Sequence, residues 1–164
     1  MIIHIHNNDI VQSSDDVYLY HANEVPLIDN IKKTDDITQA GIVLVSYDDF
    51  MQLSDTQKTT VYLLLTADDI GRHLELSHLN GIVIYITDFK DGRVFSLVRH
   101  IRQVSDVNII IAGEFGIDQA AYFYKSGANG FIIDDNQIET IKNTLNDLKT
   151  AHFGQSASSL PMFR

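Results

Sequence analysis

The chain has 164 residues, 45% hydrophobic and 21% charged, a composition typical of one soluble globular domain. Its 22 acidic residues outnumber its 12 basic residues and give a net charge of −10, which argues against nonspecific binding to nucleic acid or to an anionic membrane. The absence of cysteine excludes disulfides, thiolate nucleophiles and thiolate zinc sites. No apolar run approaches the ~20 residues that span a bilayer. The N-terminus lacks the basic segment of a signal peptide, so we expect a cytoplasmic protein.

The first forty residues differ in pattern from the rest of the chain. Apolar and polar residues alternate over residues 2–11 with a turn in the middle, which predicts a β-hairpin. His4 and His6 share one face of the first strand, but no carboxylate is placed beside them, so we predict no metal site. A short strand is expected over residues 17–20. The polar stretch over 29–39 fits either a short helix or a loop.

From residue 41 onward, near-continuous apolar runs alternate with helical patterns. The strands are expected at 42–45, 61–66, 82–86, 108–112 and 130–133, and the helices at 48–53, 67–76, 92–104, 117–126 and 136–152. Apolar runs of this kind are typical of parallel strands buried on both faces, and the alternation predicts right-handed βαβ units.

We therefore expect an α/β fold with a single doubly wound parallel sheet of about five strands, helices on both faces, and the β-hairpin in front. A partial (β/α) barrel is the alternative, because five strands are too few for a closed barrel of the usual eight. The expected segments are a hairpin and connecting segment over 1–40, a parallel core over 41–154, and a flexible, serine-rich tail over 155–164.

The turn that follows the strand at 82–86 is the first candidate site, since ligands of α/β proteins bind outside the carboxyl ends of strands. Asp91 can cap the next helix. On that helix, Ser96 and Arg99 lie opposite the apolar stripe, and Arg93 and Arg102 flank it. Two interpretations stay open: a solvated basic face, or a contact surface for an acidic partner or an anionic ligand. We also expect Arg93 to pair with a carboxylate of a neighbouring βα loop, with Asp118 as the first choice.

A second candidate loop begins at Gly113. A glycine-containing loop before a helix can expose N–H groups to an anion, but Glu114 would oppose a phosphate, and a structural turn is the favoured interpretation. Asp118 is expected to cap the following helix, which leaves Gln119 free for a polar contact at the sheet edge. Gly127 is expected to end that helix in a left-handed conformation.

The ordered motifs between residues 81 and 135 carry a resemblance to a known family. An Asp-Gly-Arg turn is followed by an aromatic residue, a serine and two arginines, and then by a glycine, an Asp-Gln pair and a Gly-x-x-x-Phe segment. The residues in question are Phe89, Asp91, Gly92, Arg93, Phe95, Ser96, Arg99, Arg102, Gly113, Asp118, Gln119, Gly127 and Phe131. This segment resembles small bacterial proteins of unknown function that are encoded beside the assimilatory sulfite reductase and labelled probable oxidoreductases of sulfite reduction.

The chain departs from the family pattern at three places, as a divergent member would. In this chain Ile86-Thr87 replaces the Phe-Pro of the family pattern, Ile110-Ile111 replaces its Arg-Ala, and Lys125-Ser126 replaces its Arg-Cys. Any anion-binding role of that missing arginine, or thiol role of that missing cysteine, is therefore in doubt.

The resemblance implies a cytoplasmic accessory protein of sulfite reduction that acts as a binding module, with sulfite reductase or its electron donor as partner. The implied ligand- or partner-binding residues are Phe89, Asp91, Gly92, Arg93, Ser96, Arg99, Arg102, Gly113, Asp118 and Gln119. Catalytic residues, cofactor and oligomeric state are left open.

Two other functions compete with this one. An oxidoreductase of sulfite metabolism would use a nicotinamide or a flavin, yet no Gly-x-Gly-x-x-Gly follows any expected strand. A degenerate response-regulator receiver is suggested by Asp91-Gly92 and by the segment 125–131. However, Ile84 stands where a receiver has its phosphoacceptor aspartate, and the last strand ends in Asp134-Asp135 where a receiver has lysine.

Overall fold

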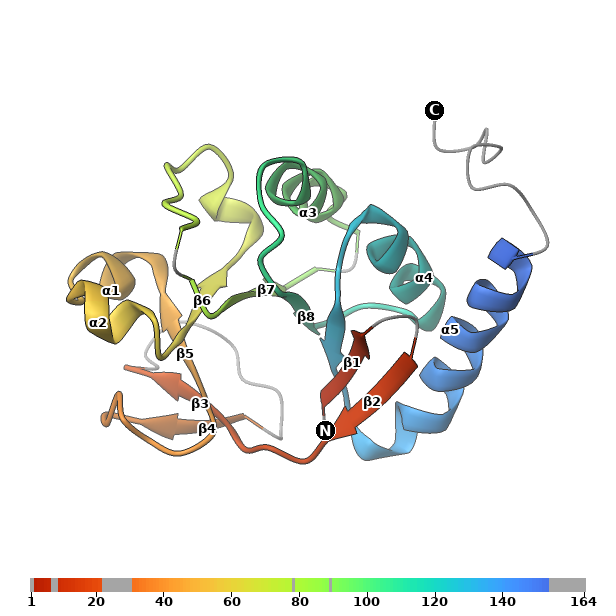
Figure 1. Ribbon diagram of the computed structural model, residues 1–164, viewed down its shortest axis with the longest axis horizontal. Helices are drawn as coiled ribbons and strands as arrows, with labels where there is room; N and C mark the ends of the chain where they lie inside the picture. Colours follow the sequence, from red (N-terminus) through yellow and green to blue (C-terminus); the bar gives the residue numbers. More distant parts are fainter. Residues whose placement is uncertain (1, 7–8, 22–30, 78, 89, 154–164) are drawn as a thin grey trace.

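A computed structural model describes residues 2–6, 9–21, 31–77, 79–88 and 90–153. In this part of the chain, nine strands form one sheet in the order β2-β1-β9-β8-β7-β6-β5-β3-β4. The sheet curls so that the helices lie around its outside (Figure 1). The strands are β1 (Ile2–His6), β2 (Asp9–Ser13), β3 (Val17–Tyr20), β4 (Ile31–Thr34), β5 (Ile42–Ser46), β6 (Tyr62–Leu65), β7 (Gly81–Ile86), β8 (Ile109–Gly113) and β9 (Gly130–Ile132).

Five α-helices and two 3-10 turns belong to the described residues. They are α1 (Tyr47–Met51), α2 (Asp55–Lys58), α3 (Arg93–Val104), α4 (Ile117–Ser126) and α5 (Ile138–Phe153), with the turns η1 (Ala67–Asp69) and η2 (Asp135–Gln137). The expected helix over 117–126 agrees with α4, and the one over 92–104 differs from α3 by one residue.

The five strands expected from the apolar runs are present as β5 to β9, and each is parallel to the next. They do not form a sheet of their own. β3 adds a parallel strand beside β5, and β4 adds another beside β3. The hairpin β1–β2 joins the other side of the sheet because β1 pairs antiparallel with β9. The predicted hairpin is confirmed, but it is part of the main sheet, and four of the nine strands come from the first forty residues.

The expectation of a doubly wound sheet with helices on both faces is wrong, and the alternative of a partial (β/α) barrel describes the fold. From β5 to β9 each strand lies beside the one before it, so the order never reverses. Right-handed crossovers that always advance in the same direction place their helices on the same face. The described helices accordingly pack on the outer face, which also makes the sheet curl around its inner face (Figure 1).

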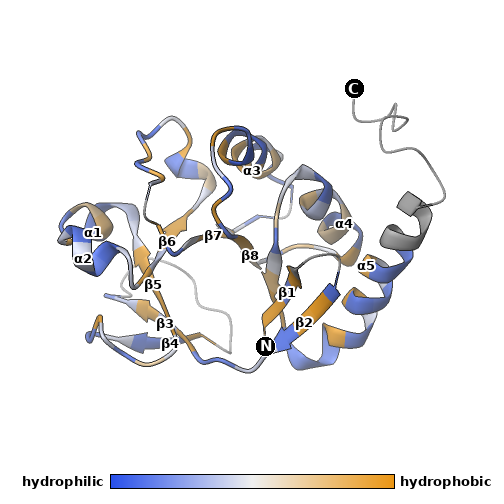
Figure 2. Cartoon of the chain, in the orientation of Figure 1, coloured by the Kyte–Doolittle hydropathy of each residue, from blue (hydrophilic) through white to orange (hydrophobic). Residues whose placement is uncertain are grey.

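Both faces of the sheet are apolar, as the continuous runs predict. Every residue of β7 is buried; Ile82, Ile84 and Ile86 face the outer core, whereas Val83 and Tyr85 face the inner one. Hydropathy follows this arrangement, with apolar strands inside and polar outer helix surfaces (Figure 2). The inner cluster contains strand residues: Ile2, Val17, Leu19, Ile31, Ile42, Leu44, Leu64, Val83, Tyr85, Ile110, Ala112 and Ile132.

Two local expectations are also wrong. The stretch 67–76 forms only the single turn η1, because Thr66 and Asp69 cap each other and Gly71 then adopts φ +88°, where a helix cannot continue. The polar stretch 29–39 contains strand β4 instead of a helix or loop. Backbone pairing with β3 stabilises it, since Ile31 alone is buried and its lysines are exposed. The expected tail over 155–164 lies outside the described residues.

Candidate functional site at the carboxyl edge of the sheet

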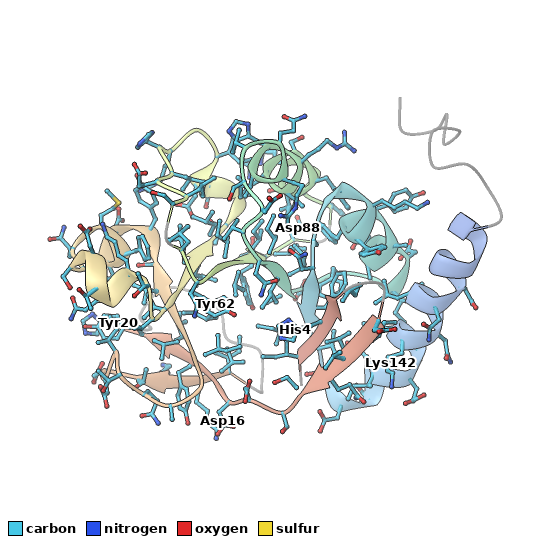
Figure 3. All side chains as sticks on the ribbon, viewed as in Figure 1. His4, Asp16, Tyr20, Tyr62, Asp88 and Lys142 are labelled. Atoms are coloured by element: carbon cyan, nitrogen blue, oxygen red, sulfur yellow. The ribbon has the colours of Figure 1, made fainter. Side chains whose placement is uncertain are left out.

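The loops after β5 to β9 meet at one edge of the curled sheet, because parallel strands place their carboxyl ends together. This is the edge at which (β/α) proteins bind their ligands. The loop after β7 contains Asp88, which lies beside the start of α3 (Figure 3). The loop after β8 begins at Gly113, and the loop after β9 begins with Ile133 and Asp134. Phe89, a predicted site residue in the first of these loops, lies outside the described residues.

Asp91 and Arg93 form an ion pair at this edge. The Arg93 guanidinium donates to both carboxylate oxygens of Asp91, at 2.9 Å from Nε to Oδ1 and 2.7 Å from Nη2 to Oδ2. The backbone N–H of Arg93 also donates to Asp91 at 3.1 Å, which confirms Asp91 as the cap of α3. These bonds lower the pKa of the Asp91 carboxyl, chiefly through the side-chain hydrogen bond from Arg93.

The expected partner of Arg93 from a neighbouring loop is Asp68 and not Asp118. Asp68 follows β6, and its Oδ1 lies 3.8 Å from Nη2 of Arg93. The carboxylates within 4 Å of Arg93 in the described chain are thus Asp91 and Asp68. Asp118 was expected because the strands that end near residues 86 and 112 place their loops at one edge, but β6 lies on the other side of β7 and its loop reaches the same edge. With its charge engaged by two carboxylates, Arg93 has little capacity left for an anionic ligand.

An open pocket of about 680 Å³ lies over the ends of β8 and β9. We call it the carboxyl-edge pocket. Three predicted site residues line it: Gly113, Asp118 and Gln119. Its other lining residues are Glu114, Phe115, Gly116, Ile132, Ile133, Asp134 and Gln137. The ionisable residues in its lining are therefore all acidic.

Two of the three predicted pocket residues, Gly113 and Gln119, stabilise the local backbone structure. Gly113 has φ +96°, and an added Cβ would lie 2.3 Å from the carbonyl oxygen of Ile86, so this strand end tolerates no side chain. Gln119 closes the start of α4, because its Oε1 accepts the backbone N–H of Gly116 at 2.8 Å. The expectation that Asp118 caps this helix and leaves Gln119 free is wrong. The side chain of Asp118 lies over Gly116, where the absence of a Cβ leaves it room.

The remaining predicted residues lie away from the pocket. Ser96 and Arg99 are exposed on the outer face of α3. Arg102, at the other end of α3, donates to the carbonyl of Gly127 at 2.7 and 2.9 Å and to the Asn129 side chain at 2.5 Å. Gly127 ends α4 with φ +122°, which confirms a positive-φ stop. The predicted set is therefore divided among the carboxyl edge, the outer face of α3 and a structural contact near the amino end of β9.

Tyr85 is a polar residue at this edge that the sequence analysis missed. It is only 4% exposed and faces the inner cluster. Burial raises the pKa of its phenol, and the negative charge of Glu114 raises it further. Tyr85 lies within the apolar run 81–86, and a tyrosine in such a run is indistinguishable by sequence from an ordinary core residue. Its alternation with Ile84 and Ile86 was the signal that it faces the other side of the sheet.

The described residues contain no group of three or more histidine, aspartate or glutamate side chains placed to hold a metal ion. None of the helices that the structure describes is both long and apolar enough to cross a bilayer.

Comparison with known proteins places the chain in a family. Residues 63–163 match the model of a bacterial protein family of unknown function, DUF934. The matched region runs from β6 through α5 and includes the whole carboxyl-edge pocket, Arg93 and α3. No curated protein and no solved structure shows significant similarity to the chain. Because the match spans more than half of its residues, the chain belongs to the DUF934 family of bacterial proteins of unknown function.

Proposed function

We propose that this protein is a cytoplasmic accessory protein of assimilatory sulfite reduction, and that it acts as a binding module. Its contact surface is the α3 face, which consists of the exposed residues Ser96, Arg99, His100 and Gln103. This surface docks on an acidic patch of its partner, which is sulfite reductase or the electron donor of that enzyme.

The observation that carries this proposal is the charge of α3. The helix has no acidic residue in a chain whose net charge is −10. Of its three arginines, Arg99 lies on the α3 face, whereas Arg93 pairs with Asp91 and Arg102 binds the Gly127 carbonyl. Arg99 is exposed and forms no hydrogen bond or ion pair with any described residue, so its guanidinium is free to meet a partner. Long-range attraction between opposite charges steers docking and selects against partners of the same sign.

Apolar and aromatic groups border the α3 face, as expected of a protein interface. Val104 is 62% exposed at the end of α3, and Tyr122 on α4 is 47% exposed. The Tyr122 ring contacts Phe95 of α3 edge to face, with 6.5 Å between the ring centroids, so α4 places an aromatic side chain beside α3. Arginine and tyrosine are the residue types most often found at the energetic centre of interfaces.

The link to sulfite reduction is supported by the resemblance over residues 81–135, which spans α3. The test is a titration of the purified protein against purified sulfite reductase and, separately, its electron donor, by calorimetry at low salt and at ~0.3 M salt. We expect one of the two to bind, with an affinity that falls as salt screens the charges.

Charge reversal identifies the surface. Arg99→Glu is expected to weaken binding at least tenfold, whereas the matched control Lys33→Glu, on the exposed edge strand β4, leaves the affinity within twofold. Absence of binding to both proteins, together with normal sulfite reduction in a deletion strain, would falsify the proposal. Equal effects of the two substitutions would move the contact away from α3.

An oxidoreductase of sulfite metabolism is the second candidate, and the position of the carboxyl-edge pocket favours it. Enzymes of (β/α) architecture hold substrates and cofactors at this edge. The acidic lining opposes the phosphates of nicotinamide and flavin cofactors, however. Thermal shifts of the purified protein with NADPH, FMN and FAD decide the matter: a shift of several degrees with any of them supports the enzyme, and none leaves the binding module as the better account.

A further inference from the structure

Strand β2 forms one edge of the nine-stranded sheet and carries an exposed apolar side chain. Among the described strands it pairs only with β1, so one side of its backbone faces no neighbouring strand. Ile10 packs against the outer cluster, and side chains alternate along a strand, so Val11 faces the inner side. Val11 is nevertheless 51% exposed, and it borders an open hollow of about 500 Å³. An exposed edge of this kind is a template for pairing with another strand.

The hydrogen bonds of β1 show which backbone groups of β2 point outward. The N–H of Ile5 on β1 donates to the carbonyl of Asn129 at 2.6 Å, so Ile5 directs its backbone groups away from β2. Ile5 lies opposite Ile10, and hydrogen-bonded and non-hydrogen-bonded positions alternate along an antiparallel pair. Ile10 and Gln12 therefore point their N–H and C=O groups to the free edge, whereas those of Val11 point to β1. In the described chain these outward groups form no hydrogen bond.

The other edge of the sheet, strand β4, is protected against pairing. Lys32 and Lys33 are exposed on this four-residue strand, and Lys32 pairs with Asp16 at 3.3 Å. Lysines on an edge strand disfavour contact with another strand, because the contact would remove their charges from water. β2 has no lysine or arginine, and its one charged residue, Asp9, is at its first position. Of the two edges, β2 is therefore the one suited to a partner strand.

The sequence of β2 is complementary to itself. When two copies pair antiparallel about a two-fold axis at Val11, Ile10 of each copy lies opposite Gln12 of the other, and their outward backbone groups bond to one another. The two Val11 side chains then meet at a non-hydrogen-bonded position, where opposite side chains are closest. Asp9 lies opposite the uncharged Ser13, so this carboxylate does not face its own copy. A second copy of the chain thus matches the backbone, the apolar side chain and the charge of this edge.

We propose that the protein forms a homodimer in solution by antiparallel pairing of β2 with β2 of a second copy, about a two-fold axis at Val11. The contact is small, so the dimer is weak and reversible. Each copy has a net charge of −10, so the dimer is expected to strengthen as salt screens the repulsion. Binding through the α3 face is expected to weaken with salt, so the two proposals can fail independently.

Disulfide crosslinking tests the register, because the chain contains no cysteine of its own. Val11→Cys places two thiols across the axis at a Cα separation of about 4.5 Å, which a disulfide can bridge. The controls are Ser13→Cys on the same strand, which would face Asp9 of the second copy, and Val104→Cys at the exposed end of α3. Under mild oxidation, non-reducing electrophoresis should show that Val11→Cys forms a covalent dimer at least tenfold faster than either control.

Sedimentation equilibrium of the full chain measures the association itself, at low salt and at ~0.3 M salt. Val11→Lys brings two ammonium groups together at the axis, and Gln12→Pro removes an outward N–H without breaking the pairing with β1. Each is expected to weaken association at least tenfold, whereas the matched control Val104→Lys leaves it within twofold. Circular dichroism verifies folding, and Val11→Lys decides alone if Gln12→Pro does not fold.

Three results would overturn the proposal. The first is a monomer at every concentration up to ~1 mM, since that leaves no association of useful strength. The second is an oligomer larger than a dimer, because two-fold pairing of β2 is closed and cannot propagate. The third is equal crosslinking of the three cysteine variants, or association unchanged by Val11→Lys, which would place the contact elsewhere.

Discussion

Arg102 joins the end of α3 to the turn between α4 and β9 by binding both the carbonyl of Gly127 and the side chain of Asn129. The Asn129 oxygen also accepts the backbone N–H of Ile109 at 2.9 Å, so the contact extends to the start of β8. Gly127 makes room for the arginine, since an added Cβ would lie 2.7 Å from Arg102 Cγ. A residue expected to bind a ligand thus stabilises the fold.

We predict that Arg102→Ala lowers the free energy of unfolding by roughly 2–3 kcal/mol, because a partly buried carbonyl and amide lose charged donors. Urea denaturation followed by circular dichroism measures the change. The control is Arg99→Ala on the exposed face of the same helix, which should change the stability by less than about 0.5 kcal/mol. Similar effects of the two substitutions would show that the Arg102 contacts contribute nothing.

Gly113 and Gly92, two glycines of the predicted site, are expected to respond oppositely to alanine. Gly113→Ala should destabilise the protein by roughly 2–4 kcal/mol, since it combines an unfavourable φ with a backbone clash. Gly92 has φ −68° and nothing within 4 Å of an added Cβ. Gly92→Ala should therefore be neutral or stabilising by up to about 1 kcal/mol. Thermal and urea unfolding of both variants test this contrast, and a harmless Gly113→Ala would contradict it.

Tyr85→Phe is expected to stabilise the protein by roughly 1 kcal/mol, because it removes a buried hydroxyl that forms no hydrogen bond with any residue in the described part of the chain. Tyr47→Phe is the matched comparison, since the Tyr47 hydroxyl donates to the carbonyl of His73 at 2.9 Å. That substitution should be neutral or mildly destabilising. Urea unfolding measures both. A clear loss of stability in Tyr85→Phe would mean that the hydroxyl already has a partner in the folded state.

His4 is expected to make the stability depend on pH. It lies on the inner side of the curl (Figure 3), and burial lowers the pKa of its imidazole, with Asp15 opposing the shift. The neutral form is thus favoured in the folded state. The contribution of neutral His4 to the free energy of unfolding is complete above the pKa of about 6.5 that a histidine has in the unfolded chain. This contribution is lost as the pH falls toward the lowered pKa of His4 in the folded protein.

The measurement compares urea unfolding at pH 7.5 and pH 5 for the wild type and His4→Asn. The variant should lose less stability than the wild type over this interval. His100→Asn, an exposed histidine on α3, serves as the control and should behave as the wild type does. A parallel NMR titration of the His4 imidazole should give a pKa below 6.5, and a higher value would reverse the prediction.

The local interactions along the chain were sufficient to predict most elements. Hydrophobic periodicity located α3 and α4 nearly to the residue, and the apolar runs located all five strands from β5 to β9. The cap at Asp91 and the helix end at Gly127 were also predictable, because each depends on the chemistry of one residue near one helix end.

Features that depend on distant parts of the chain were decided only by the tertiary structure. Apolar strands look alike whether their order reverses or advances, so the sequence could not distinguish a doubly wound sheet from the curled, singly wound one. Strand β4 forms because its backbone pairs with β3. Arg102 binds Gly127 and Asn129, which are 25 and 27 residues further along the sequence, and only the fold brings them next to it. The composition of the carboxyl-edge pocket was likewise set by the meeting of two loops, since a side chain acquires its neighbours only when separate strand ends come together.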